Sequence, residues 1–305
     1  MAVCSIPGHY IDLHRSGGPG RAEYICPAQP IPGGIPLMTP RIRRLLGLFT
    51  ALVCLFSVAP VVVIVLESFT ATQYVVFPPR GLSLQWYVEF LRRPEFVNSA
   101  IVSLVVALCS CLIATTLGTM IALALARQSS ASGRILQSIF MAPLSLPGII
   151  LGLGLLQLFA GWGIPRNVAT MIFTHVVITL PFAIRFVSIA VLGIDRDAER
   201  AAQSLGADPW MTFRKITVPL IRPGIIASLV FAFILSFDEL AASLFISSPA
   251  ATNLPVRIFV YIEQNYDPLI TSVSSILVFA AIVVLIVIER TIGMGRLFGL
   301  RTRSV

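Results

Sequence analysis

Long apolar runs alternate with short polar connections along most of the chain. Residues 45–66 carry no charged side chain, and a helix needs about 20 such residues to cross a bilayer. Five further apolar runs follow, at about 97–126, 135–160, 168–193, 221–246 and 268–288. The pattern predicts an all-α integral membrane protein with six transmembrane helices.

The composition excludes a soluble globular domain. The 305 residues are 56% hydrophobic and only 12% charged, with a mean hydropathy of +0.90, whereas soluble domains carry about 25% charged residues. A net charge of +8 would suit nucleic acid, but that needs a solvated basic face, and here the basic residues fall singly between apolar runs. We therefore expect membrane lipid, and no nucleic acid, as the partner of most of the surface.

Two residue counts remove further classes of function. The chain has a single lysine, Lys215, which lies between Arg214 and Ile216, so it lacks the Gly-Lys-Ser/Thr sequence of a phosphate-binding ATPase loop. The five cysteines form no Cys-x-x-Cys pair. We expect no disulfide, no metal site and no cofactor.

The first forty residues differ from the rest. They are rich in Gly and Pro and show no periodicity, which predicts a disordered extension over 1–40. Met38 directly precedes a basic stretch and the first apolar run, so it is a candidate for the true start. Because the run 45–66 is longer than the core of a signal peptide, it should remain as a membrane anchor.

Basic residues predict the orientation of the spans. They concentrate in the segments 41–44, 127–134, 194–222 and 290–303 and are sparse in the alternate connections, such as 67–96 and 247–267. Connections rich in Lys and Arg stay in the cytoplasm. Both termini are therefore expected on the cytoplasmic side.

The cytoplasmic connection 194–220 carries its own helix signals. Good helix formers follow Asp195, and Gly206 provides a position for a sharp turn. Asp208 before Pro209 is typical of the start of a second short helix, which Pro219 should end. An amphipathic helix pair lying on the membrane surface without a partner would show the same pattern.

The same segment resembles a known motif. Ala201-Ala202, Gly206-Ala207, Phe213, Ile216 and Pro219 match at fixed offsets the motif EAAxxxGAxxxxxFxxIxLP of inner-membrane permeases of binding-protein-dependent ABC importers. Two positions depart from it: Arg200 replaces the glutamate of the motif, with Glu199 one residue earlier, and Val218 replaces its leucine.

The resemblance implies a type I permease fold over residues 41–300, with 194–220 as a coupling loop that contacts the ATPase. The implied coupling residues are Glu199, Arg200, Ala201, Ala202, Gly206, Ala207, Asp208, Phe213, Ile216 and Pro219. It also implies location in the bacterial inner membrane and an assembly with an ATPase dimer, a second permease and a periplasmic solute-binding protein.

Within that family the chain is similar to the spermidine/putrescine type. The features are Ser236-Phe237-Asp238-Glu239-Leu240 and Leu254-Pro255-Val256-Arg257, followed by Asp267-Pro268. They imply import of a polyamine, while permeases of the same superfamily for iron, thiamine, phosphonate or opine stay open. An ion-coupled secondary transporter is a rival from another class, but it would predict inverted repeats, and none is convincing.

Asp238 and Glu239 are the acids inside a predicted span. Counting about 1.5 Å per residue from Arg222 places them in the outer part of the bilayer core. Carboxylates there need water or a counter-charge, which a cationic substrate in the pathway would supply. A structural ion pair or a cap at a helix break is the alternative. Because adjacent residues point about 100° apart on a helix, we expect only one of the two to face the pathway.

Other polar or small residues within the spans have structural interpretations. His175 stands without a second histidine or acid near it in sequence and indicates a contact between helices. Gly118, Gly148, Gly152 and Gly154 are typical of close helix packing. Pro143 and Pro147 predict kinks in the third span.

Overall fold

The computed structural model describes residues 40–126 and 130–292. It divides into two compact units, residues 1–56 and 57–305. The predicted disordered extension at 1–40 lies almost entirely outside the described residues. Within the described part the regular elements are helical, so the expected fold class is confirmed. The elements are α1 (Pro40–Glu67), α2 (Gln85–Arg92), α3 (Pro94–Ala126), α4 (Ala131–Met141), η1 (Ala142–Ser145), α5 (Gly148–Gly161), α6 (Val168–Leu192), α7 (Arg196–Ser204), α8 (Pro209–Thr212), the π-helix η2 (Phe213–Thr217), α9 (Val218–Phe237), α10 (Ser243–Ile246), α11 (Leu254–Gln264) and α12 (Leu269–Ile292).

Four helical segments in the described part are long and apolar enough to cross a membrane. They are Arg44–Glu67, Pro94–Ala126, Val168–Leu192 and Pro209–Phe237. A fifth span results if the bent pair Ala131–Ser145 and Gly148–Gly161 is counted as one. The last predicted run, 268–288, falls in α12, whose apolar part Leu269–Val283 is shorter. The number of six spans stays a prediction.

Two predicted spans are not continuous helices. The run 135–160 is broken before Pro147, and its two halves meet at an angle of 107°. The kink predicted at this proline is therefore confirmed, and it is a complete break in the helix. Proline lacks the N–H that would continue the helix. The run 221–246 is helical only to Phe237, and a short α10 follows the break.

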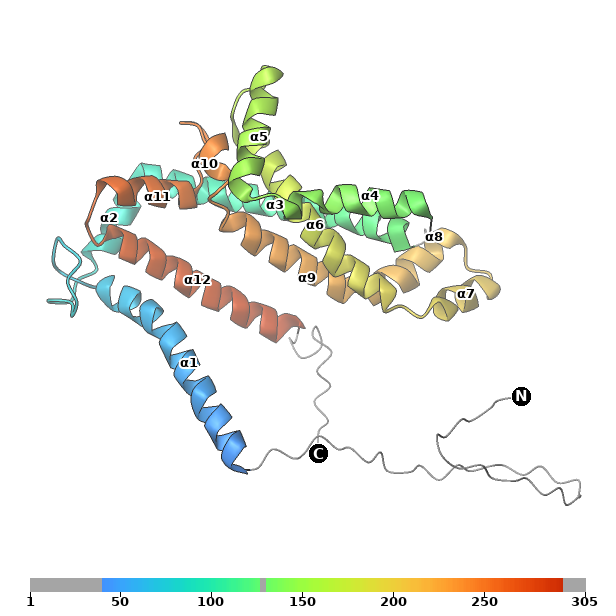
Figure 1. Cartoon of the computed structure of the whole chain (residues 1–305), viewed down its shortest axis with the longest axis horizontal. Coiled ribbons are helices and arrows are strands. Elements are labelled where there is room, and N and C mark those ends of the chain that lie inside the picture. The colour runs from blue at the N-terminus through green and yellow to red at the C-terminus, as the bar shows by residue number, and fades with distance from the viewer. Residues whose placement is uncertain (1–39, 127–129, 293–305) are drawn as a thin grey trace, which may run out of the picture. The chain divides into compact units, whose positions relative to one another are not determined.

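Helices α3, α6 and α9 form the central bundle of the unit 57–305 (Figure 1). Small residues let their backbones approach closely, which is how helices associate in lipid. A Cβ on Gly118 would lie 2.8 Å from the Cβ of Ala183, and one on Gly224 would lie 2.5 Å from the Cβ of Ala190. The predicted packing role of Gly118, Gly148 and Gly152 is confirmed, whereas a Cβ on Gly154 would meet no described residue within 4 Å.

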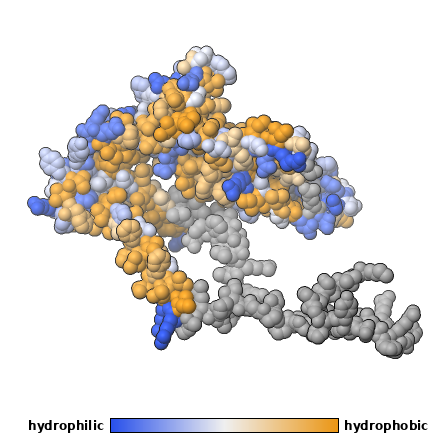
Figure 2. Space-filling view, in the orientation of Figure 1, coloured by the Kyte–Doolittle hydropathy of each residue, from blue (hydrophilic) through white to orange (hydrophobic). Residues whose placement is uncertain are grey.

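A smaller core lies at the opposite end of the bundle from α7. It joins α2 with the starts of α3, α11 and α12 through Trp86, Phe90, Phe96, Leu254 and Leu269. Figure 2 shows hydrophilic residues at the α7 end and over the α2–α11 end, with mainly apolar surface between them. This distribution is what a chain with two aqueous faces and a lipid-facing belt requires.

Candidate functional site

The segment 194–220 folds into the two short helices that its sequence predicts. The Asp195 side chain accepts a hydrogen bond from the Asp197 N–H at 3.0 Å and starts α7, and the Asp208 side chain accepts one from the Met211 N–H at 2.8 Å and starts α8. Between the helices Gly206 has a φ of +89°. Side-chained residues rarely adopt this left-handed conformation, so the glycine makes the sharp turn possible.

The predicted coupling residues fall into two groups by exposure. Arg200, Ala201, Gly206, Asp208 and Pro219 are exposed, while Glu199, Ala202, Ala207, Phe213 and Ile216 are half-buried. Two large apolar side chains between them are also uncovered: Leu205 is 90% exposed and Trp210 is 67% exposed. An apolar surface of this kind on a polar loop is typical of a site for another protein.

Glu199 faces inward and contacts the base of α9. It accepts a short hydrogen bond from the hydroxyl of Thr217, which is 2% exposed, and both residues line a small cavity beside α3 and α6. Arg200 points outward and pairs with Asp197 at 3.5 Å, in an exposed ion pair that contributes little stability. Arg200, which replaces the glutamate of the motif, and Glu199 before it are thus placed differently. Glu199 holds α7 against the bundle, and Arg200 is on the surface.

One prediction for this segment was wrong. Pro219 does not end the second short helix, because the helix continues through the π-helix η2 into α9. Pro219 lies in the first turn of α9, where its missing N–H and fixed φ are tolerated. The wide turn of η2 precedes it directly, and such π-turns interrupt an otherwise regular helix at a defined place.

The second site lies where α9 ends at Phe237 within the bundle. The residues 238–242 do not form a regular helix before α10 begins at Ser243. Asp238 is exposed, whereas Glu239 is half-buried and its Oε1 accepts a hydrogen bond from the Ala242 N–H at 2.9 Å. The Glu239 side chain thus bonds the backbone of the break directly before α10.

The Glu239 side chain also lines a cavity of about 170 Å³. The other walls come from the bend between α4 and α5 and from α6, and include Leu144, Leu146, Gly148, Ile178 and Phe182. Among these lining residues Glu239 is the charged one. A Cβ on Gly148 would lie 3.7 Å from its Oε1, so the start of α5 closely approaches the carboxylate. An apolar cavity with one carboxylate and an aromatic ring suits an organic cation.

The predicted contact of His175 with other helices is confirmed, and the structure identifies its partners. Its ring is buried, and its two nitrogens bond the hydroxyls of Ser236 at 2.8 Å and Ser243 at 2.9 Å, on either side of the break in span five. Sequence analysis predicted only a contact between helices. The partners are 61 and 68 positions away along the chain, so no local signal could identify them.

Glu67 is another residue that sequence analysis missed. It is the last residue of α1, is 2% exposed, and neither carboxylate oxygen has a hydrogen-bond partner within the described residues. The signal was available, because Glu67 directly follows the charge-free run 45–66. It was assigned instead to a solvated connection.

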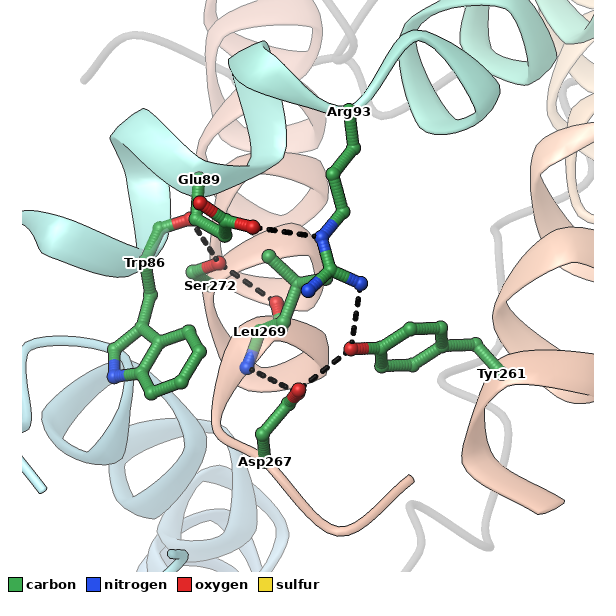
Figure 3. A network of polar contacts seen from close by, with 7 residues as sticks. All are labelled: Trp86, Glu89, Arg93, Tyr261, Asp267, Leu269 and Ser272. Carbon is green, nitrogen blue, oxygen red and sulfur yellow. Dashed lines mark hydrogen bonds and ion pairs between the residues drawn. The ribbon is translucent and has the colours of Figure 1, made fainter. Parts of the chain in front are cut away.

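At the end of the bundle opposite α7, a polar network fixes α2, α11 and α12 together (Figure 3). Arg93 bonds Glu89 at 2.9 Å and donates to the Tyr261 hydroxyl at 2.9 Å, and that hydroxyl donates to Asp267. Ser272 donates to the backbone carbonyl of Trp86. The predicted outer connections are therefore structured surfaces.

Two pKa values in this network depart from their ordinary range. Burial, and then the hydrogen bond to Asp267, raise the pKa of Tyr261 to about 12. The hydrogen bond to Glu89 raises the pKa of Arg93. Arg93 and Tyr261 therefore both keep their protons at physiological pH.

Comparison with known proteins agrees with this arrangement. Residues 114–294 match the family model "Binding-protein-dependent transport system inner membrane component". The putrescine transport system permease protein PotI of Escherichia coli is 34% identical over 232 residues, which are 74% of this chain and 82% of PotI. The E. coli spermidine/putrescine permease protein PotC is 27% identical over 80% of this chain and 92% of its own length.

A solved structure shares the fold. It is a bacterial alginate ABC transporter in complex with an alginate-bound periplasmic protein, with a TM-score of 0.63 and 17% identity over 83% of this chain and 96% of that chain. The family match covers more than half of the chain, and PotI adds an independent match over most of it. This chain therefore belongs to the binding-protein-dependent transport system inner membrane components, and is a permease subunit of an ABC importer that leaves ATP hydrolysis to a separate subunit.

Proposed function

We propose that this chain forms half of the translocation pathway of a polyamine importer, and that Glu239 contacts the cationic substrate in that pathway. The observation that carries the proposal is the position of the Glu239 carboxylate at an otherwise apolar cavity. PotI and PotC, by their names, transport putrescine and spermidine, whose chains combine ammonium groups with methylene segments.

The cavity chemistry favours such a solute. A charged group within a membrane bundle is costly unless a counter-charge or water reaches it. Oε1 of Glu239 is held by the Ala242 N–H, and the carboxylate has a second oxygen that can accept an ammonium group. The apolar walls, with the ring of Phe182 among them, suit a methylene chain and attract a cation through the aromatic face.

The segment 194–220 is proposed as the contact with the ATPase. Support comes from its exposed apolar residues, Leu205 and Trp210, and from the connection of α7 to the base of α9 through Glu199 and Thr217. A displacement of α7 would reach α9 through this bond and the continuous helix α8–η2–α9. The side chain that offers charge to the ATPase is then Arg200.

The remaining partners follow from the class of transporter. A second permease completes the pathway, two ATPase subunits drive it, and a periplasmic binding protein delivers the solute to the face formed by α2 and α11. The distribution of arginines supports a cytoplasmic location for both termini. Transport proceeds by alternating access, with the cavity at Glu239 exposed in turn to each side.

Uptake of labelled putrescine into proteoliposomes tests the proposal. The complete transporter, with its ATPase, second permease and binding protein, is reconstituted with wild-type chain or with Glu239→Gln. Loss of one charge-assisted contact to an ammonium is worth about 1.5–3 kcal/mol, so we expect uptake to fall about tenfold or more.

Asp238→Asn is the matched control. It removes the same charge one position earlier, from a side chain that is exposed and does not line the cavity, and it should keep nearly full uptake. Wild-type uptake in Glu239→Gln would refute the role of Glu239. Absence of putrescine and spermidine uptake by the wild-type transporter, with ATP hydrolysis intact, would refute the substrate class.

A further inference from the structure

The unwound segment 238–242 needs partners for its backbone, because exposed N–H and C=O groups are not tolerated in the hydrocarbon region. Helix α9 ends just before it and α10 begins just after it. Within this segment the Glu239 side chain satisfies the Ala242 N–H. Neighbouring residues satisfy most of the other backbone groups: the N–H groups of Asp238 and Glu239 bond the last turn of α9, and the carbonyls of Leu240 and Ala242 accept from Leu244 and Phe245. Further bonds, to the Glu239 carbonyl and to the serines on either side of the break, come from elements farther away in sequence.

Asn253 supplies two of these contacts. Its Nδ2 donates to the backbone carbonyl of Glu239 at 3.0 Å and to the Ser243 hydroxyl at 3.0 Å. Its Oδ1 accepts from the Val256 N–H and caps α11. Because Asn253 is 1% exposed, water cannot replace these bonds. One amide side chain thus joins the unwound segment to the helix that forms the outer face.

His175 closes the arrangement from α6. It bonds Ser236 before the break and Ser243 after it, so it bridges the two ends of the interruption. Ser243 is shared with Asn253. Buried polar networks that are fully bonded fix one arrangement of the groups they join.

We propose that His175 and Asn253 are positioning residues that hold the unwound segment, and with it the Glu239 carboxylate, in one conformation at the cavity. The proposal rests on the pathway role of Glu239 given above. His175 acts through Ser236 and Ser243 and does not touch the substrate. Asn253 makes the position of the carboxylate depend on the position of α11, on the face where solute arrives.

Chemical labelling of the segment tests the positioning directly. Leu240→Cys is introduced into the reconstituted transporter after the five native cysteines are replaced by alanine, and its reaction with a water-soluble methanethiosulfonate is timed. Loss of the buried bonds in His175→Phe or Asn253→Ser should release the segment and speed labelling about tenfold.

Thr174→Val is the matched control for His175→Phe. Thr174 is the adjacent residue and is fully buried, but its hydroxyl bonds the Thr170 carbonyl of its own helix. Labelling in this variant should stay within about twofold of the parent. Unchanged labelling in both His175→Phe and Asn253→Ser, or equally faster labelling in Thr174→Val, would overturn the proposal.

A double-mutant cycle of putrescine uptake then asks whether His175 acts through Glu239. If it does, His175→Phe lowers uptake in the wild-type background and has little further effect in Glu239→Gln. If instead the fold-losses of uptake in the two single variants multiply in the double variant, His175 does not act through Glu239. Normal uptake in Glu239→Gln alone would refute the proposed function, while the labelling experiment would still decide the positioning role.

Discussion

Replacement of Gly152 by alanine should disturb the packing of α5 against the break in span five. A Cβ at this position would lie 2.6 Å from the Cα of Ala242 and 2.9 Å from its carbonyl oxygen. Both are backbone atoms, so no side-chain rotation relieves the overlap. Ala242 is also the residue whose N–H holds the Glu239 carboxylate, and any relief of the clash therefore moves the proposed substrate contact.

The magnitude follows from a comparison within the same helix. Gly154→Ala adds the same methyl group at a position where no atom of the described part of the chain lies within 4 Å. Alanine is favoured over glycine in a helix by about 1 kcal/mol at both positions, so this gain cancels between the two variants. The difference isolates the overpacking at Gly152, which should be about 1–3 kcal/mol.

The difference in stability between the two variants can be measured by thermal unfolding of the assembled transporter in nanodiscs. Each kcal/mol of lost stability lowers the melting temperature by about 2–4 °C. Gly152→Ala should melt below Gly154→Ala and should also lose putrescine uptake. Equal melting temperatures with equal uptake would refute the close approach of α5 to Ala242.

Three further outcomes are expected. The Tyr261→Phe variant should have a lower melting temperature than wild type at neutral pH, and this difference should shrink between about pH 10 and 12. The reason is that Tyr261 keeps its proton in the folded protein up to a pKa of about 12, whereas an unfolded tyrosine loses its proton near pH 10. A difference in melting temperature that does not change with pH would contradict the buried hydroxyl. Thr217→Val should raise the ATP consumed per putrescine imported, since Glu199 then loses its bond to the base of α9; an unchanged ratio counts against this link. Glu67→Gln should raise the melting temperature by a few degrees, because a neutral amide replaces a buried carboxylate that has no partner among residues 40–126 and 130–292. A lower melting temperature would contradict this and show that the carboxylate has a partner in the assembly.

Much of the segment 194–220 could be predicted because its signals are local. The caps at Asp195 and Asp208 and the turn at Gly206 each involve residues within three positions of one another. The exception was Pro219, where the continuation through η2 overrode the expected helix end. A proline restricts its own turn, but whether the helix resumes depends on how α9 packs.

Sequence analysis also narrowed the proposed substrate contact to two adjacent acids, Asp238 and Glu239, without choosing between them. The choice depends on the break after Phe237, which sets the directions of both side chains. It also depends on the bend before Pro147, which brings the start of α5 to the cavity. Apolar runs look alike whether or not they are interrupted. Pro147 predicted a kink at the second place, but no signal predicted the break after Phe237.

Composition and local pattern were enough to predict a membrane environment, the helical class, the apolar segments and the two short helices of the segment 194–220. Composition and caps act within one segment and need no knowledge of its neighbours. The packing of the helices was needed to find that Glu239 lines a cavity, that His175 and Asn253 bond to the interruption beside it, and that Glu67 is buried. These properties depend on residues brought together from distant parts of the chain, and in the low-dielectric interior their polar groups take whichever partners the packing of the helices provides.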